Sequence, residues 1–453
     1  MGRSRVELLF VVAGLAIGAG CNNTLFDAAG VPAVGALVCT APATHACEAI
    51  RLCKANDDAS FCEASCHRCE TGVAGAKAIC SANRCTYECP AGLLKCAGGC
   101  CPAVAVSAGG DHACAVTATS GELLCWGANN DGQLGIGYDP SLPVAPETGV
   151  DQATPVKVAL PGRAVAVGAG GAHSCAVLDT GAVWCWGRKS SYAGGKDYDF
   201  APTEVIGLVG ATAVASGGAH SCFITAGGAV RCVGSWDPVG AVKDLPVASG
   251  ATILTAGDDF TCAIVGSAPD GSNAAVRCWG ANDHAQLGAG APGTVTQPVS
   301  VPLGPPVVAV GAGVHHTCAS TPTGPLRCWS SKRVGTTTDT QDPYRPDGVD
   351  FAATAIAGGQ MHTCAVPSGA RDGVACWGQD VVPPVVVGGA PASVGALVHV
   401  PFTAPVVALA AGDFHTCALA ADGRVACWGM GARGQLGDNR KADSAAPVFV
   451  ISR

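Results

Sequence analysis

The sequence has few charged side chains for its length. Of its 453 residues, 26 are Lys or Arg and 34 are Asp or Glu, so that charged residues make up 13%. An ordinary soluble domain carries roughly 25%, and a disordered chain combines high charge with few apolar residues. Hydrophobic residues reach 49% here, which excludes a disordered chain. The net charge of −8 also argues against nucleic acid as a partner, because phosphates attract basic surfaces.

The sequence motifs of common enzymes are missing as well. The chain has no G-x-S-x-G nucleophile elbow, phosphate-binding loop, zinc-protease helix or haem motif. A catalytic cysteine is disfavoured because the cysteines that follow Cys21 form even sets. We therefore expect no enzyme activity, no cofactor and no metal site.

Cysteine, in contrast, is abundant. The chain contains 27 Cys, together with 63 Gly and 29 Pro. Because cytosolic thiols are kept reduced, so many cysteines predict disulfides and an oxidising compartment. The odd total divides into one cysteine near the N-terminus, twelve in a compact region and fourteen in a repeat.

The N-terminus has the order of a secretory signal peptide. Two Arg residues precede an apolar run from Leu8 to Ile17, three small residues and Cys21. The run is too short to span a bilayer. Residues 1–20 resemble a bacterial lipoprotein signal, although Gly18 stands where that family usually has Leu, which leaves ordinary secretory cleavage open. The resemblance implies lipid on Cys21 and, from Asn22, the outer membrane.

Residues 21–38 are interpreted as a lipid-anchored tether and residues 39–101 as a Cys-rich module. The module has twelve Cys and few large apolar residues, so disulfides must replace a hydrophobic core. Their connectivity cannot be read from the spacing. A zinc site at Cys62, Cys66 and Cys69 is an alternative, because thiolates at this spacing can converge on one ion. An even set of cysteines in an exported chain favours disulfides.

From residue 102 to residue 453 the chain is a sevenfold repeat. Each unit contains V-x-x-A-G-x-x-H-x-C-A, a short turn and V-x-C-W-G. A unit spans about 50 residues, the length of one four-stranded propeller blade. The cysteine pairs of the seven units are Cys114 with Cys125, Cys175 with Cys185, Cys222 with Cys232, Cys262 with Cys278, Cys318 with Cys328, Cys364 with Cys376, and Cys417 with Cys427.

The spacing within a pair predicts a β-hairpin. If Cys175 faces Cys185 across two antiparallel strands, a loop of three residues, 179–181, remains between them. The last position of such a loop requires a positive φ, which Gly adopts easily. Four units place Gly there, namely Gly181, Gly228, Gly324 and Gly423. Opposed residues at a non-hydrogen-bonded site come within disulfide reach, so we predict one hairpin disulfide in each unit.

The units resemble the repeats of the regulator of chromosome condensation family. They share its W-G-x-N-x-x-G-Q-L-G pattern at Trp126 to Gly135, Trp279 to Gly288 and Trp428 to Gly437, whereas Val233 and Ser330 depart from it. The resemblance implies an all-β fold, a seven-bladed β-propeller. It also implies protein binding, since the member that names the repeat exchanges guanine nucleotides on a small GTPase and a secreted bacterial relative inhibits β-lactamases.

The ends of the repeat suggest how the ring closes. The first unit lacks the P-V-x-V strand that precedes later units, such as Pro155 to Val158, and the last unit ends with a spare copy, Pro447 to Val450. We predict that this C-terminal strand pairs beside Val104 to Ala108, completes the first blade and closes the propeller. Such closure would leave no long unpaired edge.

Repeated polar and aromatic residues are the candidates for chemistry. Six His precede the first Cys of a unit by two positions, namely His112, His173, His220, His316, His362 and His415. We expect them to hydrogen-bond local backbone rather than to form a metal ring, because equivalent positions lie far apart around a propeller axis. The repeated Trp are expected to pack between blades rather than to form a carbohydrate platform. Asp111, Asp258 and Asp413 make no consistent carboxylate pair.

The expected function is binding rather than catalysis. We predict an exported, monomeric propeller, held in the outer membrane or at the cell surface only by a lipid anchor, which binds an unknown protein or envelope component. If Cys21 is not lipidated, the protein is secreted. The alternatives are a polysaccharide lyase or glycosidase, which needs two carboxylates in a cleft, and a structural envelope component. Binding is expected in the long inserts, which are Ile136–Ala153, Lys189–Thr203, Ala289–Gln297, Ser330–Asp350 and Gln379–Thr403.

Overall fold

The computed structural model forms two compact units, Met1–Pro90 and Ala91–Ser452. It describes residues 61–62, 67–68, 77–81, 84–96, 99–137, 149–192, 198–234, 242–245, 250–266, 273–304, 306–330, 349–369, 373–378 and 397–452. The predicted signal peptide, tether and lipidated Cys21 lie outside these residues.

The described part of the first unit consists of two short antiparallel hairpins. They are formed by β1 (Phe61–Cys62) with β2 (His67–Arg68), and by β3 (Lys77–Ser81) with β4 (Arg84–Glu88). The backbone register of the second hairpin places Cys80 opposite Cys85. The side chains of the alternative zinc set lie outside the described part of the unit.

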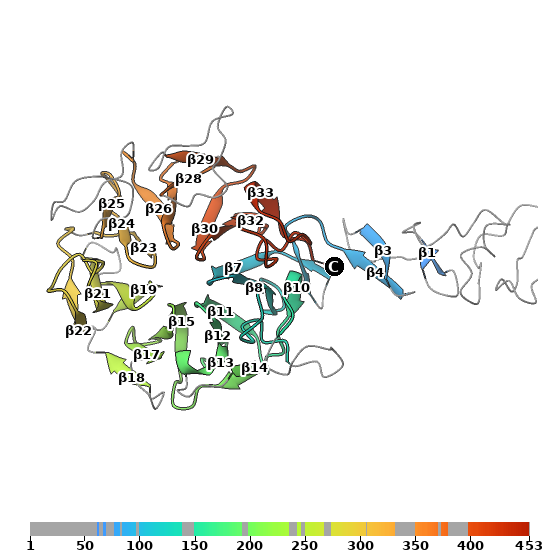
Figure 1. Ribbon diagram of the computed structural model, residues 1–453, viewed down its shortest axis with the longest axis horizontal. Coiled ribbons are helices and arrows are strands. Elements are labelled where there is room, and N and C mark those ends of the chain that lie inside the picture. The colour runs from blue at the N-terminus through green and yellow to red at the C-terminus, as the bar shows by residue number, and fades with distance from the viewer. Residues whose placement is uncertain are drawn as a thin grey trace, which may run out of the picture. The chain divides into compact units, whose positions relative to one another are not determined.

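The described part of the second unit contains seven antiparallel sheets around a common axis (Figure 1). This arrangement confirms the predicted seven-bladed β-propeller. Each sheet is one blade, whose strands follow each other from the axis outward in chain order. One blade is therefore one uninterrupted stretch of sequence.

The strand boundaries show the same pattern in every blade. The first blade contains β7 (Ala103–Ala108), β8 (His112–Thr117), β9 (Leu123–Gly127) and β10 (Gln152–Lys157). The second contains β11 (Ala164–Ala169), β12 (His173–Leu178), β13 (Val183–Arg188), the 3-10 helix η2 (Lys189–Ser191) and β14 (Tyr198–Glu204). The third contains β15 (Ala211–Ser216), β16 (His220–Thr225), β17 (Val230–Gly234) and β18 (Lys243–Leu245). The fourth contains β19 (Ala251–Ala256), β20 (Phe260–Val265), β21 (Ala275–Ala281) and β22 (Thr294–Ser300).

The remaining blades follow in the same order. The described strands of the fifth are β23 (Ala309–Ala312), β24 (Thr317–Ser320) and β25 (Arg327–Trp329). The sixth contains β26 (Ala353–Gly358), β27 (His362–Pro367), β28 (Gly373–Gly378) and β29 (Val398–Pro401). The seventh contains β30 (Val406–Ala411), β31 (His415–Ala420), β32 (Val425–Gly429) and β33 (Ser444–Phe449). No helix among the described residues is long and apolar enough to cross a membrane.

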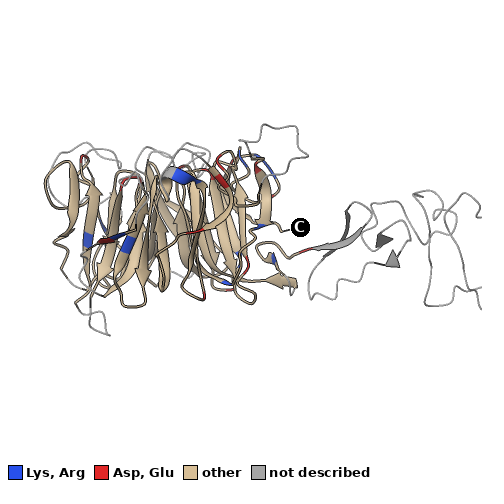
Figure 2. Ribbon diagram, turned by 90° about the horizontal axis from the view of Figure 1, so that it is seen from below, with Lys and Arg blue, Asp and Glu red and all other residues tan. Residues whose placement is uncertain are grey.

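The antiparallel order gives the propeller two distinct faces. The turns between the first and second strands open on the same face as the connections between the third and fourth strands, and we call it the loop face. The cysteine hairpin turns lie on the opposite face, the turn face. Figure 2 views the blades edge-on and shows that charged residues are sparse and scattered along the ribbon. The third strand of each blade ends at the loop face, where the inserts in which we expect binding begin. Residues 138–148, 193–197, 331–348 and 379–396 of these inserts lie outside the described residues.

The cysteine hairpin of each blade has the expected register. In the second blade Cys175 faces Cys185 and Val177 faces Val183, and Gly181 has a φ of 79°. The structure joins all seven repeat pairs as disulfides, with Cα atoms 4.0–4.1 Å apart. These cysteines are buried, so the disulfides are part of the core between the blades.

The predicted closure by strand exchange is wrong. The C-terminal strand β33 pairs with β32 of its own blade, with Val448 opposite Cys427, and the first blade is completed by its own β10. The P-V-x-V strand therefore ends the blade that precedes it in sequence. Its connection from the third strand turns the chain back, so antiparallel pairing with that third strand is the local solution. The ring closes by packing of the complete seventh blade against the complete first blade.

Residues 91–101 pack with the propeller, although we expected them in the Cys-rich module. They contain the hairpin of β5 (Leu94–Cys96) and β6 (Gly99–Cys101), with a Cys96–Cys101 disulfide. Gly92 exchanges backbone hydrogen bonds with the seventh blade, donating to Val450 O and accepting from Val425 N, each at 2.9 Å. Leu94 is fully buried in the cluster that joins the seventh and first blades. This hairpin therefore ties the end of the chain to the start of the ring.

A ring of glycines sets the distance between blades at the axis. In the first turn of every unit, a Cβ on the Gly of the A-G-x-x-H motif would lie 2.1–2.6 Å from the carbonyl oxygen of the corresponding Gly in the next blade. The same Cβ would also meet the imidazole, or in the fourth unit the phenyl ring, of its own blade at 2.1–2.5 Å. The seven residues are Gly109, Gly170, Gly217, Gly257, Gly313, Gly359 and Gly412. Only Gly fits at these positions.

Candidate functional site

The repeated histidines connect neighbouring blades. His112 Nε2 lies 2.8 Å from Ser174 Oγ, the hydroxyl that follows the equivalent His in the next blade. The same contact, at 2.7–2.9 Å, joins His173 to Ser221, His220 to Thr261, His316 to Thr363, and His362 to Thr416. The expectation of a local backbone partner is therefore wrong for Nε2. These histidines hold the ring together from blade to blade.

Two blade interfaces lack this contact between a His and a hydroxyl group, and the sequence explains both. Phe260 replaces His in the fourth blade, and Thr317 of the fifth blade donates instead to Gln286 O at 2.8 Å. At the closing interface Ala113 replaces the hydroxyl residue, and in the part of the chain that the structure describes neither ring nitrogen of the buried His415 has a hydrogen-bond partner. The interface between the seventh and first blades thus lacks a contact that five other interfaces have.

The repeated tryptophans pack between blades, as predicted. Trp186 of the second blade lies in one cluster with Cys114 and Leu134 of the first. Its Nε1 donates to Gln133 O at 2.8 Å. Trp329 and Trp126 donate in the same way, to Gln286 O and Gln435 O. The Q-L-G segment of one blade therefore receives the Trp of the next blade.

Blades without the Q-L-G segment leave this interaction incomplete. Trp279 follows the degenerate third blade and Trp377 follows the degenerate fifth blade, and the buried Nε1 atoms of both have no hydrogen-bond partner among the described residues. A sequence change in one blade therefore removes a hydrogen bond from the Trp of the next blade.

The axis of the propeller contains two cavities. The cavity at the loop face, of about 100 Å³, is lined by the A-G-x-x-H turns, and the other, of about 350 Å³, by the innermost strands. Both are lined by the same ring of small residues, one from each blade, namely Ala108, Ala169, Ser216, Ala256, Ala312, Gly358 and Ala411. The two cavities are therefore adjacent along the propeller axis on either side of this ring, and we refer to them together as the axial channel.

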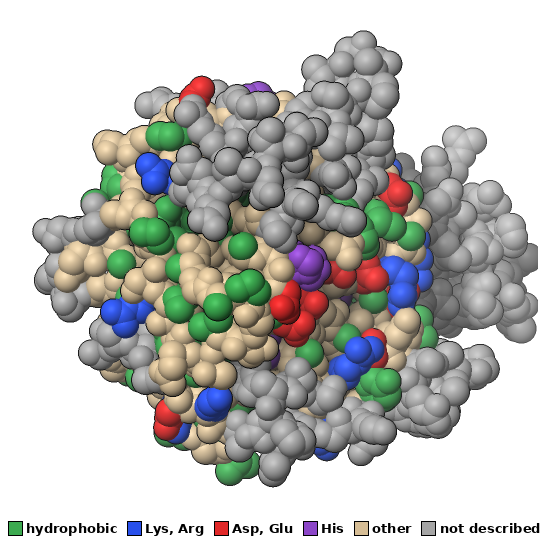
Figure 3. All heavy atoms as spheres, turned by 60° about the vertical axis from the view of Figure 1, so that its left-hand side comes forward, with side chains coloured by type: hydrophobic (Ala, Val, Ile, Leu, Met, Phe, Trp, Pro, Cys, Tyr) green, Lys and Arg blue, Asp and Glu red, His purple; other side chains and the backbone are tan. Residues whose placement is uncertain are grey.

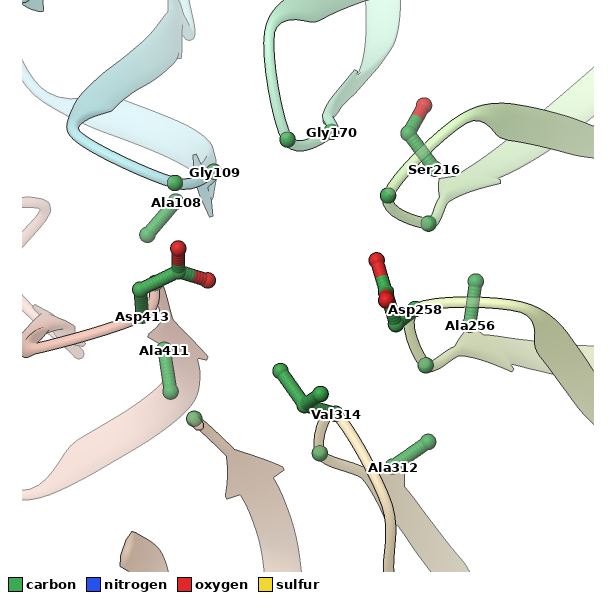
Figure 4. A pocket seen from close by; sticks show the side chains of 18 of the residues that line it. Ala108, Gly109, Gly170, Ser216, Ala256, Asp258, Ala312, Val314, Ala411 and Asp413 are labelled. Atoms are coloured by element: carbon green, nitrogen blue, oxygen red, sulfur yellow. The ribbon is translucent and has the colours of Figure 1, made fainter. Parts of the chain in front are cut away.

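Two carboxylates project into the mouth of the channel at the loop face. Figure 4 shows the side chains of Asp258 and Asp413 entering from opposite sides, with Val314 beside them. Both residues directly follow the glycine of the A-G-x-x-H motif in their blades. In the three blades between Asp413 and Asp258 around the ring, this position is occupied by Gly110, Gly171 and Gly218. The two carboxylates thus flank an arc of the mouth that carries no side chains.

The mouth is an acidic and partly dehydrated environment. Burial, with a smaller contribution from the carboxylates of Asp111 and Asp258, raises the pKa of Asp413 to about 6. Burial also raises the pKa of Asp258, as does the neighbouring Asp259. Among the described residues, neither Asp258 nor Asp413 has an ion-pair partner. A cation in the mouth would relieve this unfavourable electrostatic energy.

Sequence reasoning missed this carboxylate pair. We dismissed Asp111, Asp258 and Asp413 because the acidic residue is not repeated in every unit. The structure brings Asp258 and Asp413 into one cavity, while Asp111 lies one position later in its turn and accepts a hydrogen bond from Gln435 at 3.4 Å. The pair could have been found by comparing the residue directly after the glycine of the A-G-x-x-H motif, because that position lines the axial cavity in several blades.

The rim of the loop face carries ion pairs and exposed apolar side chains. Arg433 of the seventh blade bonds Asp151 of the first blade through Nε, at 2.5 Å, and through Nη2, at 2.9 Å. In Figure 3 several acidic side chains lie together near the middle of the view with a His beside them, while basic and apolar side chains are scattered. Between the first and second blades, Ile136 is 37% exposed and Tyr198 is 40% exposed. A backbone hydrogen bond from Gly137 N to Phe200 O brings their two segments together.

Comparison with known proteins agrees with the geometry of the repeat. The chain matches a family model described as the regulator of chromosome condensation (RCC1) repeat over residues 103–133, 164–192 and 406–435. A second model of the RCC1 repeat matches residues 120–177 and 275–320. The chain is therefore a seven-bladed β-propeller in which these stretches match the RCC1 repeat.

Individual relatives extend over most of the propeller. The ultraviolet-B receptor UVR8 of Arabidopsis thaliana is 26% identical over 367 residues, which cover 76% of this chain and 69% of the receptor. The crystal structure of human WBSCR16 matches with a TM-score of 0.61 and 19% identity, covering 73% of this chain and 93% of that one. Prp20p from Saccharomyces cerevisiae matches with a TM-score of 0.58 and 18% identity, covering 77% and 87%. These two structures show similarity of fold.

Proposed function

We propose that this protein is a non-enzymatic interaction module, exported and anchored by lipid on Cys21, that binds another protein through the loop face of its propeller. The proposal is supported most directly by the exposed Ile136 and Tyr198 on the rim of that face. Tyr is enriched in the energetically important parts of protein interfaces. Ion pairs flank the rim, as Arg188 with Asp131 at 3.0 Å shows. Such a combination of apolar, aromatic and charged groups suits a protein surface.

The relatives give the proposal a precedent. One relative is named as a receptor, and the structure of Prp20p was presented together with its binding properties to Gsp1p and histones. The inserts of this chain differ in length from blade to blade, so the partner is expected to be specific to this protein. An exported chain would meet proteins of the envelope or of the surroundings.

Affinity capture with the full chain tests the binding face. Ile136→Asp and Tyr198→Ala alter the loop face, and Ile206→Asp is a matched control, because Ile206 is 80% exposed in the connection that enters the third blade at the turn face. We expect the wild type and the Ile206→Asp variant to enrich the same envelope or extracellular protein, and the two loop-face variants to lose it at least about tenfold. Failure of the wild type to enrich any protein contradicts the binding function, and loss with Ile206→Asp alone contradicts the loop face.

The lipid anchor has a separate test. Cys21→Ser should release the chain from the membrane fraction into the soluble fraction, because the thioether site for lipid is removed. Mass spectrometry of the mature N-terminus should find lipid on Cys21 of the wild type. A wild-type chain that is soluble and begins at another residue contradicts the anchor without affecting the binding proposal.

A further inference from the structure

Six pairs of neighbouring blades are joined by the chain itself, and several of these connections begin in the same way at the turn face. The residue that follows the outer strand donates its backbone N–H to the start of the third strand, as Val158 N does to Leu123 O at 2.9 Å. The second and fourth blades make the same bond at 2.9–3.0 Å, namely Val205 N with Val183 O and Val301 N with Val276 O. From this bond the chain crosses to the innermost strand of the next blade.

Four of the connections also place an apolar side chain between the two blades that they join. Leu208, which is 1% exposed, lies in the cluster formed by the second and third blades. Leu160, Leu303 and Phe402 pack against the clusters of three other interfaces. A connection therefore contributes to the core between two blades in addition to linking them covalently.

The seventh and first blades cannot be joined in this way, because the first blade precedes the seventh in the chain. Val450 N still donates to Val425 O, at 3.1 Å, but the next segment in space is the one that begins at Ala91, since Gly92 N donates to Val450 O. Leu94 is fully buried between the two blades, as Leu208 is between the second and third. Residues 91–101, which we call the strap, therefore take the place of the seventh connection.

The strap differs from the other connections in how its ends are held. Only its C-terminal end continues by peptide bonds into a blade, at Ala103 of the first blade. Hydrogen bonds hold it on the seventh blade, including those of Gly92 and the 2.8 Å bond from Lys95 N to Ser452 Oγ. A connection with two covalent ends stays in place when such bonds break, because the peptide bonds keep its local concentration high. The strap has no covalent link of this kind to the seventh blade.

The interface behind the strap also lacks a contact at its centre. Among the described residues, the ring of His415 has no hydrogen-bond partner, whereas five other interfaces join a His to a hydroxyl group. The loop face of this interface is joined by the hydrogen bond from Trp126 Nε1 to Gln435 O and by the ion pair of Arg433 with Asp151. An opening of this interface therefore starts at the turn face, where the strap lies.

We propose that the strap is a releasable closure of the ring, and that its release opens the interface between the seventh and first blades at the turn face while the other six interfaces stay closed. Opening exposes the apolar cluster around Leu94 and Val450. The strap directly follows Pro90, the last residue of the N-terminal unit. A pull on that unit is transmitted along the chain to the strap before it reaches any blade.

Hydrogen–deuterium exchange of the full, disulfide-bonded chain, measured by mass spectrometry, tests this closure. Leu94→Ala removes the buried side chain of the strap, and Leu208→Ala is the matched control in a connection with two covalent ends. We expect Leu94→Ala to raise exchange at least about tenfold in the segments that contain Val425 N, which is bonded to the strap, and Ala103 N, which is bonded to the seventh blade. Leu208→Ala should raise exchange at Ala211 N, the donor equivalent to Ala103 N, by much less.

A second variant, Cys96→Ser with Cys101→Ser, removes the disulfide that fixes the hairpin of the strap and should raise exchange in the same two segments. In both strap variants the third, fourth and fifth blades should exchange as in the wild type, which shows that the propeller is folded. The proposal is contradicted if neither strap variant raises exchange at this interface, if exchange rises equally around the ring, or if Leu94→Ala and Leu208→Ala have equal effects at their own interfaces. None of these outcomes bears on capture of a protein at the rim.

Discussion

At the scale of single residues, the contacts between blades depend on one hydroxyl and one ring per blade. Five of these contacts pair a His with the Ser or Thr of the next blade. The contact is absent at the closing interface because Ala113 has no hydroxyl for His415. A buried polar atom without a partner costs stability, typically about 1–3 kcal/mol. The closing interface is therefore weaker than its equivalents in this respect.

Restoring the missing hydroxyl should stabilise the propeller. Ala113→Ser places an oxygen where Ser174 and Ser221 have theirs, so we expect the free energy of unfolding to rise by about 1 kcal/mol. The comparison variant Ser174→Ala removes the partner of His112 Nε2 and should lower the free energy of unfolding by about 1–3 kcal/mol. Guanidinium unfolding with the disulfides intact measures both changes. A lower stability for Ala113→Ser would show that the site cannot take the hydroxyl.

The glycine ring makes a second prediction at this scale. A Cβ at Gly313 would lie 2.2 Å from the imidazole of His316 and 2.4 Å from Gly359 O, so Gly313→Ala must push two blades apart. We expect a loss of about 1–3 kcal/mol. Gly227→Ala is the control, because a Cβ there would meet nothing within 4 Å and Gly227 has no positive φ. Equal midpoints for the two variants in thermal unfolding would contradict the tight packing at the axis.

At the scale of elements, the disulfide hairpin is the unit that repeats without exception. The Q-L-G segment and the outer strand vary between blades, whereas each blade keeps its cysteine pair at the centre. The cysteines are fully buried between neighbouring sheets, so the disulfide fixes two strands and also fills the core.

Removing one hairpin disulfide should destabilise the protein without changing its fold. For Cys175→Ala with Cys185→Ala we expect a loss of about 2–3 kcal/mol, from the entropy of a loop of about ten residues in the unfolded chain. If Cys21 carries lipid and the even set of other cysteines is fully paired, as we propose, the wild type should show no reactive thiol even after unfolding without reductant. A thiol that reacts under these conditions would contradict that assignment, and an unchanged unfolding midpoint for the variant would contradict the contribution of the bond.

At the scale of the whole molecule, six buried histidines around the ring link protonation to unfolding. Burial lowers the pKa of His112, His220 and His362 to about 4, and that of His173, His316 and His415 to about 3. In the unfolded chain a His titrates near pH 6.5. Between about pH 6.5 and 4 the unfolded state therefore binds more protons than the folded state.

The stability of the propeller should accordingly fall in acid. It should be constant above about pH 7 and decrease progressively as the pH falls from 6.5 towards 4, with a steep slope because up to six protons are involved. Guanidinium unfolding at pH 7.5, 6 and 5 measures this slope. His362→Phe, which copies Phe260 of the fourth blade, should reduce the slope because it removes one of the six buried imidazoles. A flat profile would contradict burial of neutral histidines.

Because each blade is contiguous in sequence, the ring should tolerate new ends between blades. We expect a permuted chain that begins at Gly162, with Ser452 joined to Ala91 by a short flexible linker, to fold with stability close to the wild type. The two ends of the second unit, Ala91–Ser452, lie close together, as the 2.8 Å hydrogen bond from Lys95 N to Ser452 Oγ shows. A permutant that begins at Gly181 splits the second blade and should unfold at lower denaturant. Equal stability of the two would contradict blades as the units of the ring.

Much of the fold can be predicted from the sequence because the blade is a local structure. The ten-residue spacing of Cys175 and Cys185, with Gly181 in the loop, defines a hairpin, and strands adjacent in the chain pair with each other. The error about closure arose where a strand could pair with either of two blades. The P-V-x-V pattern of Pro447 to Val450 does not name its partner, and in the structure β10 already occupies the outer edge of the first blade, so β33 pairs with β32.

The sequence by itself determined the number of blades, their hairpins and the cysteine pairs, because each depends on residues within one unit. The tertiary structure alone decided which groups meet from different units. His112 contacts the hydroxyl of Ser174, and Trp126 donates a hydrogen bond to Gln435 O. Asp258 and Asp413 line one cavity although 154 residues lie between them in the chain. These contacts follow from the curvature of the ring, which brings turns that are distant in the sequence to one axis. No single repeat determines that curvature.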